Sequence, residues 1–345
     1  MTLKGASAPW LRVCAALLSV AVVTSGLHFV RGGVTPAPDY ACASNGAQVS
    51  VEIPQGATGS EVAEILFASG VVKSSSAYFR TAVGNPKSEQ VAPGGHLLTA
   101  KNCAQSVLTQ LLDTKRLTGL INIFEGAWNV EVIDAMVKAG FIRTDIVAAL
   151  KTAELPSGFK SAEGLLFPAQ YSFAQSSTAS SAIQTMLNRG KSEIEKSGLL
   201  AAADKYSPQQ LLIIASIIQA EGDTKDFSKI SRVIRNRLEK GIPLQMDSTV
   251  HYIKKSRGKV FLSTASTYLK SPYNTYRNYG LPPSPIGNPG TAALDAAVNP
   301  VPGDWTFFIT IAPGDTRFTS SIDEFNNFKV IYKKNLRAGL FRSSK

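Results

Sequence analysis

The apolar stretch LLIIASIIQAEG, Leu211–Gly222, decides how the second half of this chain folds. Its first eight residues are apolar or small enough to bury, so a helix over this stretch is apolar on nearly every side and belongs at the centre of a domain. Upstream, Ser207, Pro208 and Gln210 have the pattern of an N-terminal capping box, and the closing glycine is typical of a helix end. The sequence therefore predicts a buried helix that ends on a single carboxylate, Glu221.

Glu221 lies one helical turn beyond Ile217 and Ile218, so we expect its carboxyl group to leave the helix on a buried side. Burial among apolar neighbours raises the pKa of a carboxyl group, and a general acid that works at neutral pH needs such a shift. The alternative is an ordinary exposed glutamate in the last turn of a helix. That position is unfavourable for an acid, because the C-terminal end of a helix already carries partial negative charge.

Two later stretches have patterns with more than one interpretation. Asp247 precedes a helical segment and is predicted to be its N-cap, with a direct functional role as the alternative. Asn274 and Tyr276 lie in Ser271–Gly290, which is rich in Pro, Gly and Tyr. Their amide and aromatic groups suit sugar binding, although such a loop can equally pack on a core. Trp305–Ala312 is predicted to be a buried strand.

The N-terminal segment predicts the compartment. Val13–Val30 contains no formally charged residue and is bounded by Arg12 and Arg31. A helix of this length just crosses a hydrocarbon core of about 30 Å. The basic residues before it favour a cytoplasmic N-terminus. We therefore expect a cytoplasmic tail over residues 1–12 and a transmembrane helix over 13–30, with a cleaved signal peptide as the alternative.

An internal repeat follows. Val49–Lys73 and Leu120–Arg143 align without gaps at an offset of 70 residues. Each copy has a short alternating strand, a glycine turn, a helix with apolar spacing and a glycine stop. The matching pairs include Gly56 with Gly126, Ala57 with Ala127, Glu61 with Glu131, and Gly70 with Gly140. Two copies of one unit more often indicate a packing module than an active site.

These segments give a domain layout in the α+β class. Residues 31–47 are rich in Gly, Pro, Ala and Ser and are predicted to be a flexible tether. A small strand–helix module is expected over 48–114 and a larger α+β domain over 115–345. Cys42 and Cys103 lie in the compartment where disulfides persist, so a bridge and two free thiols are both open interpretations.

Charge and motifs exclude several classes of function. The 36 Lys and Arg residues against 25 Asp and Glu give a net charge of +11, which suits nucleic acid, an anionic membrane or an acidic polymer such as cell wall. No basic stripe is interleaved with aromatic residues, which argues against nucleic acid. There is no metal-ligand spacing, no glycine-rich phosphate loop and no indication of a Ser-His-Asp triad. We therefore expect neither a metal nor a cofactor.

Four separated motifs resemble those of the YceG-like (MltG-type) endolytic lytic transglycosylases of bacterial peptidoglycan. In chain order they are EGLLFPAQYSF (Glu163–Phe173), ASIIQAEG (Ala215–Gly222), VIRNRLEKGIPLQMDSTVHY (Val233–Tyr252) and SPYNTYRNYGLPPSPIGNPG (Ser271–Gly290). The single N-terminal span and the module before the larger domain, which is similar to a LysM-like module, also match. The resemblance covers nearly the whole chain beyond the tether, so it implies a LysM-like module over 48–114 and a YceG-like catalytic domain over 115–345.

The resemblance implies cleavage of the MurNAc–GlcNAc β-1,4 bond without net addition of water. Glu221 would protonate the glycosidic oxygen and then act as base while the C6 hydroxyl closes onto C1, which gives a 1,6-anhydro end. The residues that fall on matching substrate-binding positions are Gln245, Asp247, Asn274 and Tyr276, with Glu163 completing the cleft. The implied partners are glycan strands, the cell membrane and peptidoglycan synthases. The implied location is a single-pass protein of the inner membrane with its catalytic domain outside the cytoplasm.

Three departures from the family pattern leave alternatives open. Gln219 stands where many relatives have a second acid, Ala169-Gln170 where they have Asp-Thr, and Glu324-Phe325 where they often have Glu-His. One alternative is a hydrolytic muramidase that uses Asp247 or Glu163 as the second carboxylate, since hydrolases of glycosides usually need two. The other is a non-catalytic scaffold that binds the cell wall through the repeated strand–helix unit.

Overall fold

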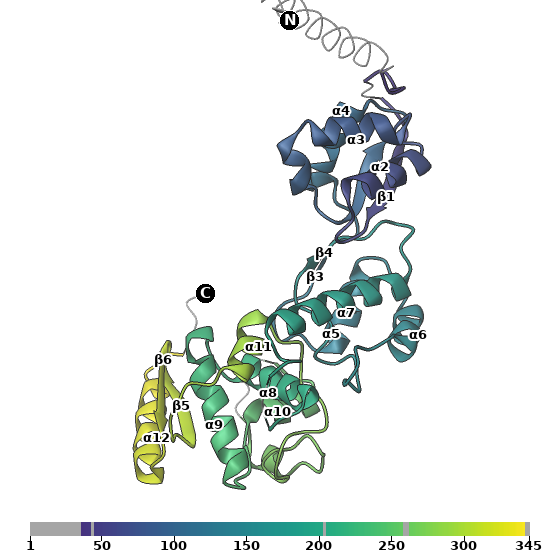
Figure 1. Ribbon diagram of the computed structural model, residues 1–345. Helices are drawn as coiled ribbons and strands as arrows, with labels where there is room; N and C mark the ends of the chain where they lie inside the picture. Colours follow the sequence, from purple (N-terminus) through teal and green to yellow (C-terminus); the bar gives the residue numbers. More distant parts are fainter. Residues whose placement is uncertain (1–35, 43–44, 203–204, 258–261, 342–345) are drawn as a thin grey trace, which may run out of the picture. The chain divides into compact units, whose positions relative to one another are not determined.

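The computed structural model describes residues 36–42, 45–202, 205–257 and 262–341, and it is a mixed α+β structure, as predicted (Figure 1). The chain divides into two compact units, Met1–Arg116 and Leu117–Lys345. The predicted cytoplasmic tail and transmembrane helix lie outside the described residues. None of the helices that the structure does describe is long and apolar enough to cross a membrane.

Unit 1 contains one antiparallel strand pair with helices between and after the strands. Its elements are β1 (Gln48–Ile53), α2 (Gly59–Ala68), α3 (Ser75–Val83), η1 (Pro86–Gln90), β2 (Gly94–Thr99), α4 (Ala104–Leu111) and η2 (Thr114–Arg116). β1 pairs with β2 from Gln48 opposite Thr99 to Ile53 opposite Gly94. The helices and strands share one apolar core, in which Leu66, Leu98 and Leu108 are fully buried. Unit 1 therefore has a hydrophobic core of its own.

Several residues of the predicted tether are attached to unit 1. Cys42 forms a disulfide with Cys103, so of the two interpretations the structure has the bridge. The carboxylate of Asp39 accepts the backbone N–H of Ala104 at 3.1 Å, at the positive N-terminal end of α4. The ammonium group of Lys73 lies over the ring of Tyr40. The tether segment that ends at Cys42 is thus held on the surface of unit 1.

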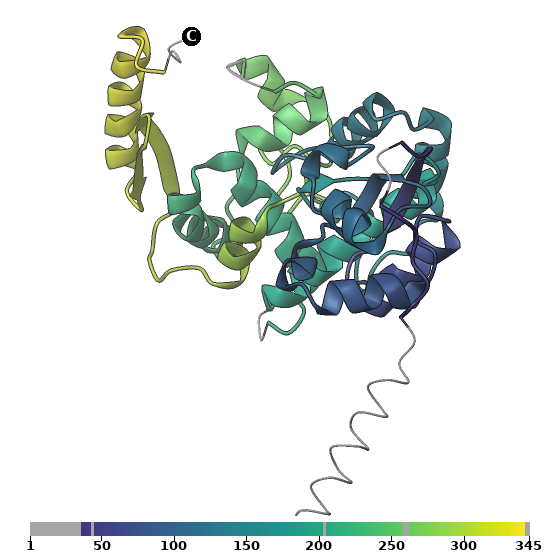
Figure 2. The same cartoon turned by 90° about the horizontal axis from the view of Figure 1, so that it is seen from above.

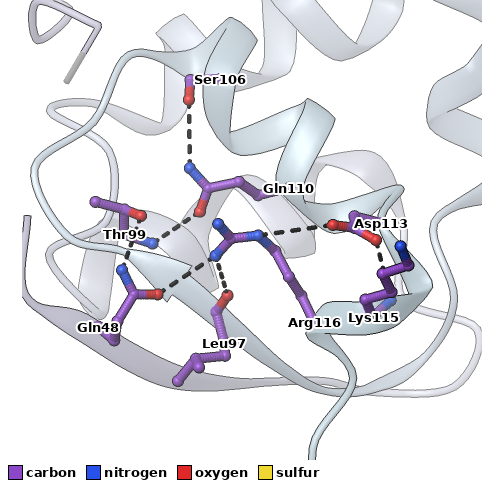
Figure 3. Close-up of polar contacts among 8 residues, drawn as sticks. All are labelled: Gln48, Leu97, Thr99, Ser106, Gln110, Asp113, Lys115 and Arg116. Atoms are coloured by element: carbon purple, nitrogen blue, oxygen red, sulfur yellow. Dashed lines mark hydrogen bonds and ion pairs between the residues drawn. The ribbon is translucent and has the colours of Figure 1, made fainter. Parts of the chain in front are cut away.

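Polar side chains fix the end of unit 1 to its strands (Figure 3). Arg116 donates to the carbonyl of Leu97 at 2.9 Å and to Oε1 of Gln48 at 3.3 Å. Oε1 of Gln110 accepts the backbone N–H of Thr99 at 2.8 Å. The Gln48–Thr99 end of the β1–β2 pair is therefore tied to α4 and to the segment that ends at Arg116.

Unit 2 begins with the second copy of the repeat. Its elements are β3 (Ile121–Asn122), α5 (Asn129–Lys138), α6 (Arg143–Thr152), β4 (Gln170–Tyr171), α7 (Ala179–Lys196), α8 (Pro208–Glu221), η3 (Thr224–Asp226), α9 (Phe227–Glu239), α10 (Asp247–Lys254), η4 (Thr264–Tyr268), α11 (Thr291–Val298), β5 (Phe307–Ala312), β6 (Asp315–Thr319) and α12 (Ile322–Arg337). β3 pairs with β4, and β5 with β6, both antiparallel. α12 lies along the β5–β6 hairpin (Figures 1 and 2).

The buried central helix predicted from the sequence is confirmed as α8. All eight residues of Leu211–Ile218 are 3% exposed or less, and α8 contacts α9, α10 and α11. The predicted capping box is present, because Ser207 and Gln210 exchange hydrogen bonds of 2.9 and 3.3 Å. Gly222 has extended backbone, with φ of −163°, rather than a left-handed turn. Glycine suits this position because a Cβ atom would lie 2.4 Å from Cδ1 of Ile230.

One local prediction was wrong, and another was confirmed only in part. Met246 is the N-cap residue of α10, whereas Asp247 is the first helical residue and makes no capping bond. Its carboxylate accepts the hydroxyl of Tyr276 instead. The strand predicted at Trp305–Ala312 exists as β5, but it is mostly half-buried because its sheet has only two strands and α12 packs against it.

Candidate active site

Glu221 is the last residue of α8, and its carboxyl group is partly buried. Its Oε1 accepts the backbone N–H of Ser248, at the start of α10, at 3.1 Å. Burial raises the pKa of Glu221 to about 7, hydrogen bonds from Ser248 oppose that rise, and the nearby charge of Asp247 adds to it. Near neutral pH this carboxyl group is therefore populated in both the protonated and the ionised form, as a group that acts first as acid and then as base requires.

Asp247 and Tyr276 lie beside Glu221. The hydroxyl of Tyr276 donates to Oδ1 of Asp247. Burial, this hydrogen bond and the charges of Asp247 and Glu221 together raise the pKa of Tyr276, while the charge of Arg237 lowers it. Tyr276 consequently stays neutral and serves as a hydrogen-bond donor, and the exposed Asp247 lies at the open side of the group.

Gln245 is placed by an unusual backbone and a buried arginine. Its φ of +52° lies in the left-handed region, which costs a non-glycine residue on the order of 1 kcal/mol. Its backbone N–H donates to the carbonyl of Thr275 at 3.1 Å. Arg237, only 7% exposed, donates to Oε1 of Gln245 and to the carbonyls of Pro243 and Leu244. The surrounding structure thus holds the exposed Gln245 side chain on the segment that leads to Asp247.

Asn274 has a different position from the other predicted site residues, because its side chain is fully buried. Its Nδ2 donates to the carbonyls of Thr267 and Leu269 at 3.0 and 2.8 Å, and its Oδ1 accepts the backbone N–H of Tyr276 at 3.0 Å. Thr267 lies in η4 and Leu269 directly after it, whereas Tyr276 is on the same loop as Asn274. Asn274 shapes the loop that carries Tyr276.

Glu163 lies between two helices of unit 2. Its Oε1 accepts the backbone N–H of Asn129, the first residue of α5, at 3.0 Å, and its Oε2 accepts the hydroxyl of Tyr252, on α10, at 3.1 Å. Burial raises the pKa of Glu163 to about 7, although both hydrogen bonds and the charge of Lys255 act in the opposite direction. Glu163 is therefore connected to the same helix whose first turn binds Glu221.

Sequence reasoning did not single out Ser248 or Tyr252, and it named Gln219 only as a departure from the family pattern. Ser248 and Tyr252 bind the two carboxyl groups from α10. Oε1 of Gln219 accepts the backbone N–H of Gly290 at 2.9 Å, which holds the loop before α11 against α8. No local sequence pattern indicates these hydrogen-bonded pairs, because the two partners of each pair are far apart in the chain. Within the described residues, no three His, Cys, Asp or Glu side chains gather as metal ligands.

The chain is similar to known proteins over most of its length. The profile of the YceG-like family matches residues 51–330. An endolytic murein transglycosylase of Bacillus subtilis strain 168 is 30% identical over 309 residues, which cover 82% of this chain and 84% of that protein. One from Streptococcus pneumoniae serotype 2 strain D39 is 33% identical over 152 residues, which cover 43% of this chain and 28% of that protein.

A solved structure is also similar to this fold. The crystal structure of a yceG-like protein from Listeria monocytogenes matches with a TM-score of 0.55 and 26% identity, over 82% of this chain and 99% of that one. The family match over residues 51–330 and this likeness in fold agree with each other. The chain belongs to the YceG-like family.

Proposed function

We propose that this protein is an endolytic lytic transglycosylase of peptidoglycan, a carbon–oxygen lyase that cleaves the MurNAc–GlcNAc β-1,4 bond. Membership of the YceG-like family and the activity named for its relatives support this activity. The observation that carries the mechanism is the carboxyl group of Glu221, which has a pKa of about 7 and lies beside Ser248, Asp247 and Tyr276.

In the proposed reaction, protonated Glu221 gives its proton to the glycosidic oxygen as the C1–O bond breaks, and the GlcNAc unit leaves with a free hydroxyl. Ionised Glu221 then removes the proton from the C6 hydroxyl of the muramic sugar as that oxygen bonds to C1. The product carries a 1,6-anhydro end, and no water is consumed. The N–H of Ser248 stabilises the ionised form between the two steps.

The proposed roles of the surrounding residues follow from their positions. Gln245, Asp247 and Tyr276 bind the sugars near Glu221, whereas Asn274 acts indirectly by shaping the loop of Tyr276. The hydrolytic alternative needs a second carboxylate free to activate water. Both oxygens of Glu163 are engaged by backbone and tyrosine donors, and Oδ1 of Asp247 accepts a hydrogen bond from the hydroxyl of Tyr276. This arrangement favours the lytic reaction, in which Glu221 alone serves as acid and base, over hydrolysis.

Replacement of the proposed acid tests the assignment. In the full chain, Glu221→Gln is expected to lower release of anhydro-ended muropeptides from purified sacculi by about 10³-fold, since general acid–base catalysis contributes roughly 10²–10⁴-fold. The matched control is Glu239→Gln, an exposed glutamate that pairs with Lys205. Full activity of Glu221→Gln would refute the proposal. Mass spectrometry of the products separates the alternatives, because reducing ends would mean that water attacked.

The expected pH dependence of the reaction follows from the direction in which the pKa of Glu221 is shifted. The first step needs protonated Glu221, whose pKa is raised to about 7. We therefore expect kcat/KM to fall as pH rises through about 7, whereas an acid with an ordinary pKa would already fall above pH 5.

Anchoring and location complete the proposal. Residues 13–30 anchor the chain in the inner membrane, with the N-terminus in the cytoplasm and the two units outside it, where they meet glycan strands and peptidoglycan synthases. The Cys42–Cys103 disulfide supports an oxidising compartment. The strand–helix–helix–strand order of unit 1 supports its assignment as a LysM-like module. Fractionation of cells, with protease protection of the two units, tests the topology.

A further inference from the structure

The N-terminus of α10 points at the proposed catalytic acid. Ser248 is the second residue of α10, so its N–H has no partner within the helix and is available to a ligand. It donates to Oε1 of Glu221 at 3.1 Å. The partial positive charge at a helix N-terminus favours a negative neighbour. The position of α10 therefore affects how readily Glu221 ionises.

One helical turn later, a side chain of α10 contacts a second carboxyl group. Tyr252 follows Ser248 by four residues, a spacing that places both on one side of a helix. Its hydroxyl donates to Oε2 of Glu163, while Oε1 of Glu163 accepts the N–H of Asn129. Glu163 thus links α10 to the N-terminus of α5.

Aromatic packing makes this second contact rigid. The ring of Tyr252 meets Trp128 edge to face at 5.9 Å and Tyr273 at 5.2 Å, and the ammonium group of Lys255 lies 3.7 Å above it. Such contacts at the edges and on the face of the ring restrict the movement of the Tyr252 side chain. A helix of eight residues held in this way moves as one body, so a change at Tyr252 is felt at Ser248.

We propose that Glu163 is a positioning residue: by holding Tyr252, it fixes α10 so that the N–H of Ser248 stays on Glu221 and favours its ionised form. This inference rests on the proposed function of Glu221. Asp247 of α10 and Tyr276, with Arg237 of α9 beyond it, also face Glu221, and Glu131 and Lys255 face Glu163. The variants below keep all of these groups.

The test measures kcat/KM for release of anhydro-ended muropeptides as a function of pH. It compares the basic limb of this profile, the pH range in which kcat/KM falls as pH rises. Glu163→Gln and Tyr252→Phe each break the contact, and only the first removes a charge. Both are expected to raise the pH of the limb by about 0.5 to 1 unit, a threefold to tenfold change in the ionisation constant of Glu221. The double variant is expected to shift the limb no further than either single variant, because both remove one interaction.

Ser248→Pro removes the donor N–H at the other end of the link, together with the hydroxyl of Ser248. Proline is tolerated in the first turn of a helix, where its missing N–H has no helical partner. We expect this variant to raise the limb at least as far, and Glu163→Gln added to it to give no further shift. The matched control is Tyr273→Phe, which removes a hydroxyl from the same aromatic group without touching Glu163. The control is expected to leave the limb in place.

Carbon-13 NMR titration of the glutamate carboxyl groups gives a second measurement that does not need turnover. It reports the pKa of Glu221 in each variant even where activity is low. The inference would be overturned if the basic limb and the pKa of Glu221 stayed at their wild-type values in both Glu163→Gln and Tyr252→Phe. A shift in Glu163→Gln alone would overturn it too, because the effect would then be the charge itself. Wild-type protein that releases no anhydro ends would instead refute the proposed function.

Discussion

The two copies of the repeated strand–helix unit have the same local geometry and different surroundings. Gly56 and Gly126 make the same left-handed turn, with φ of +79° and +78°. In the first copy, Thr58 and Glu61 exchange two hydrogen bonds and form a complete capping box. In the second, Trp128 occupies the position of Thr58 and has no hydroxyl, so only its N–H bond to the matching glutamate, at 2.7 Å, remains.

The second copy uses this difference to contact the rest of unit 2. The ring of Trp128 packs against Tyr252 and against Arg257, whose guanidinium lies 4.0 Å away. Arg257 also pairs with Glu131 at 2.6 Å, and Asn129 donates to Glu163. The expectation that both copies serve only packing is therefore too simple. The same unit completes a small core in one place and supports the candidate active site in the other.

The largest expected effect concerns the first copy, because only unit 1 has the disulfide, which joins residues 61 apart in the chain. Closing a loop of that length restricts the unfolded chain, so Cys42→Ser is expected to lower the free energy of unfolding of unit 1 by about 4 kcal/mol. Hydrogen exchange of the full chain, followed separately for each unit, measures this change. Equal loss of protection in unit 2 would contradict the independence of the two copies.

The next largest effect is expected from substitution of the turn glycine in each copy. Alanine at Gly56 or Gly126 must adopt a positive φ, which costs about 1 kcal/mol in each copy. At Gly56 a Cβ atom meets nothing within 4 Å, whereas at Gly126 it lies 3.3 Å from Cγ of Gln219. Thermal denaturation should therefore show similar losses, while release of anhydro ends falls only in Gly126→Ala. Equal activity of the two variants would mean that the second copy does not support the site.

The smallest expected effect is a difference between the capping glutamates of the two copies, Glu61 and Glu131. Glutamine keeps the capping hydrogen bond, but at Glu131 it loses the ion pair with Arg257. Glu131→Gln is expected to destabilise unit 2 by less than about 1 kcal/mol, and the difference should shrink in high salt. The matched Glu61→Gln in unit 1 keeps its local hydrogen bonds with Thr58 and should respond little to salt. Denaturation at two salt concentrations measures both, and a salt-dependent loss in Glu61→Gln would contradict this account.

Features that depend on neighbours in the chain could be predicted from the sequence. The capping box of Ser207, the buried apolar run of α8 and the repeat follow from local spacing, and the structure has each of them. Asp247 was predicted as an N-cap by the same local reasoning. That prediction failed because Tyr276, from a distant loop, takes its carboxylate.

By itself, the sequence determined that one carboxyl group, Glu221, ends a strongly apolar helix, because apolar spacing and capping act within a few residues. Only the tertiary structure decided what that carboxyl group touches. Ser248 is 27 residues from Glu221, and Tyr252 is 89 residues from Glu163. The pKa of each carboxyl group depends on burial and on these donors. Both arise only when α5, α8 and α10 pack together.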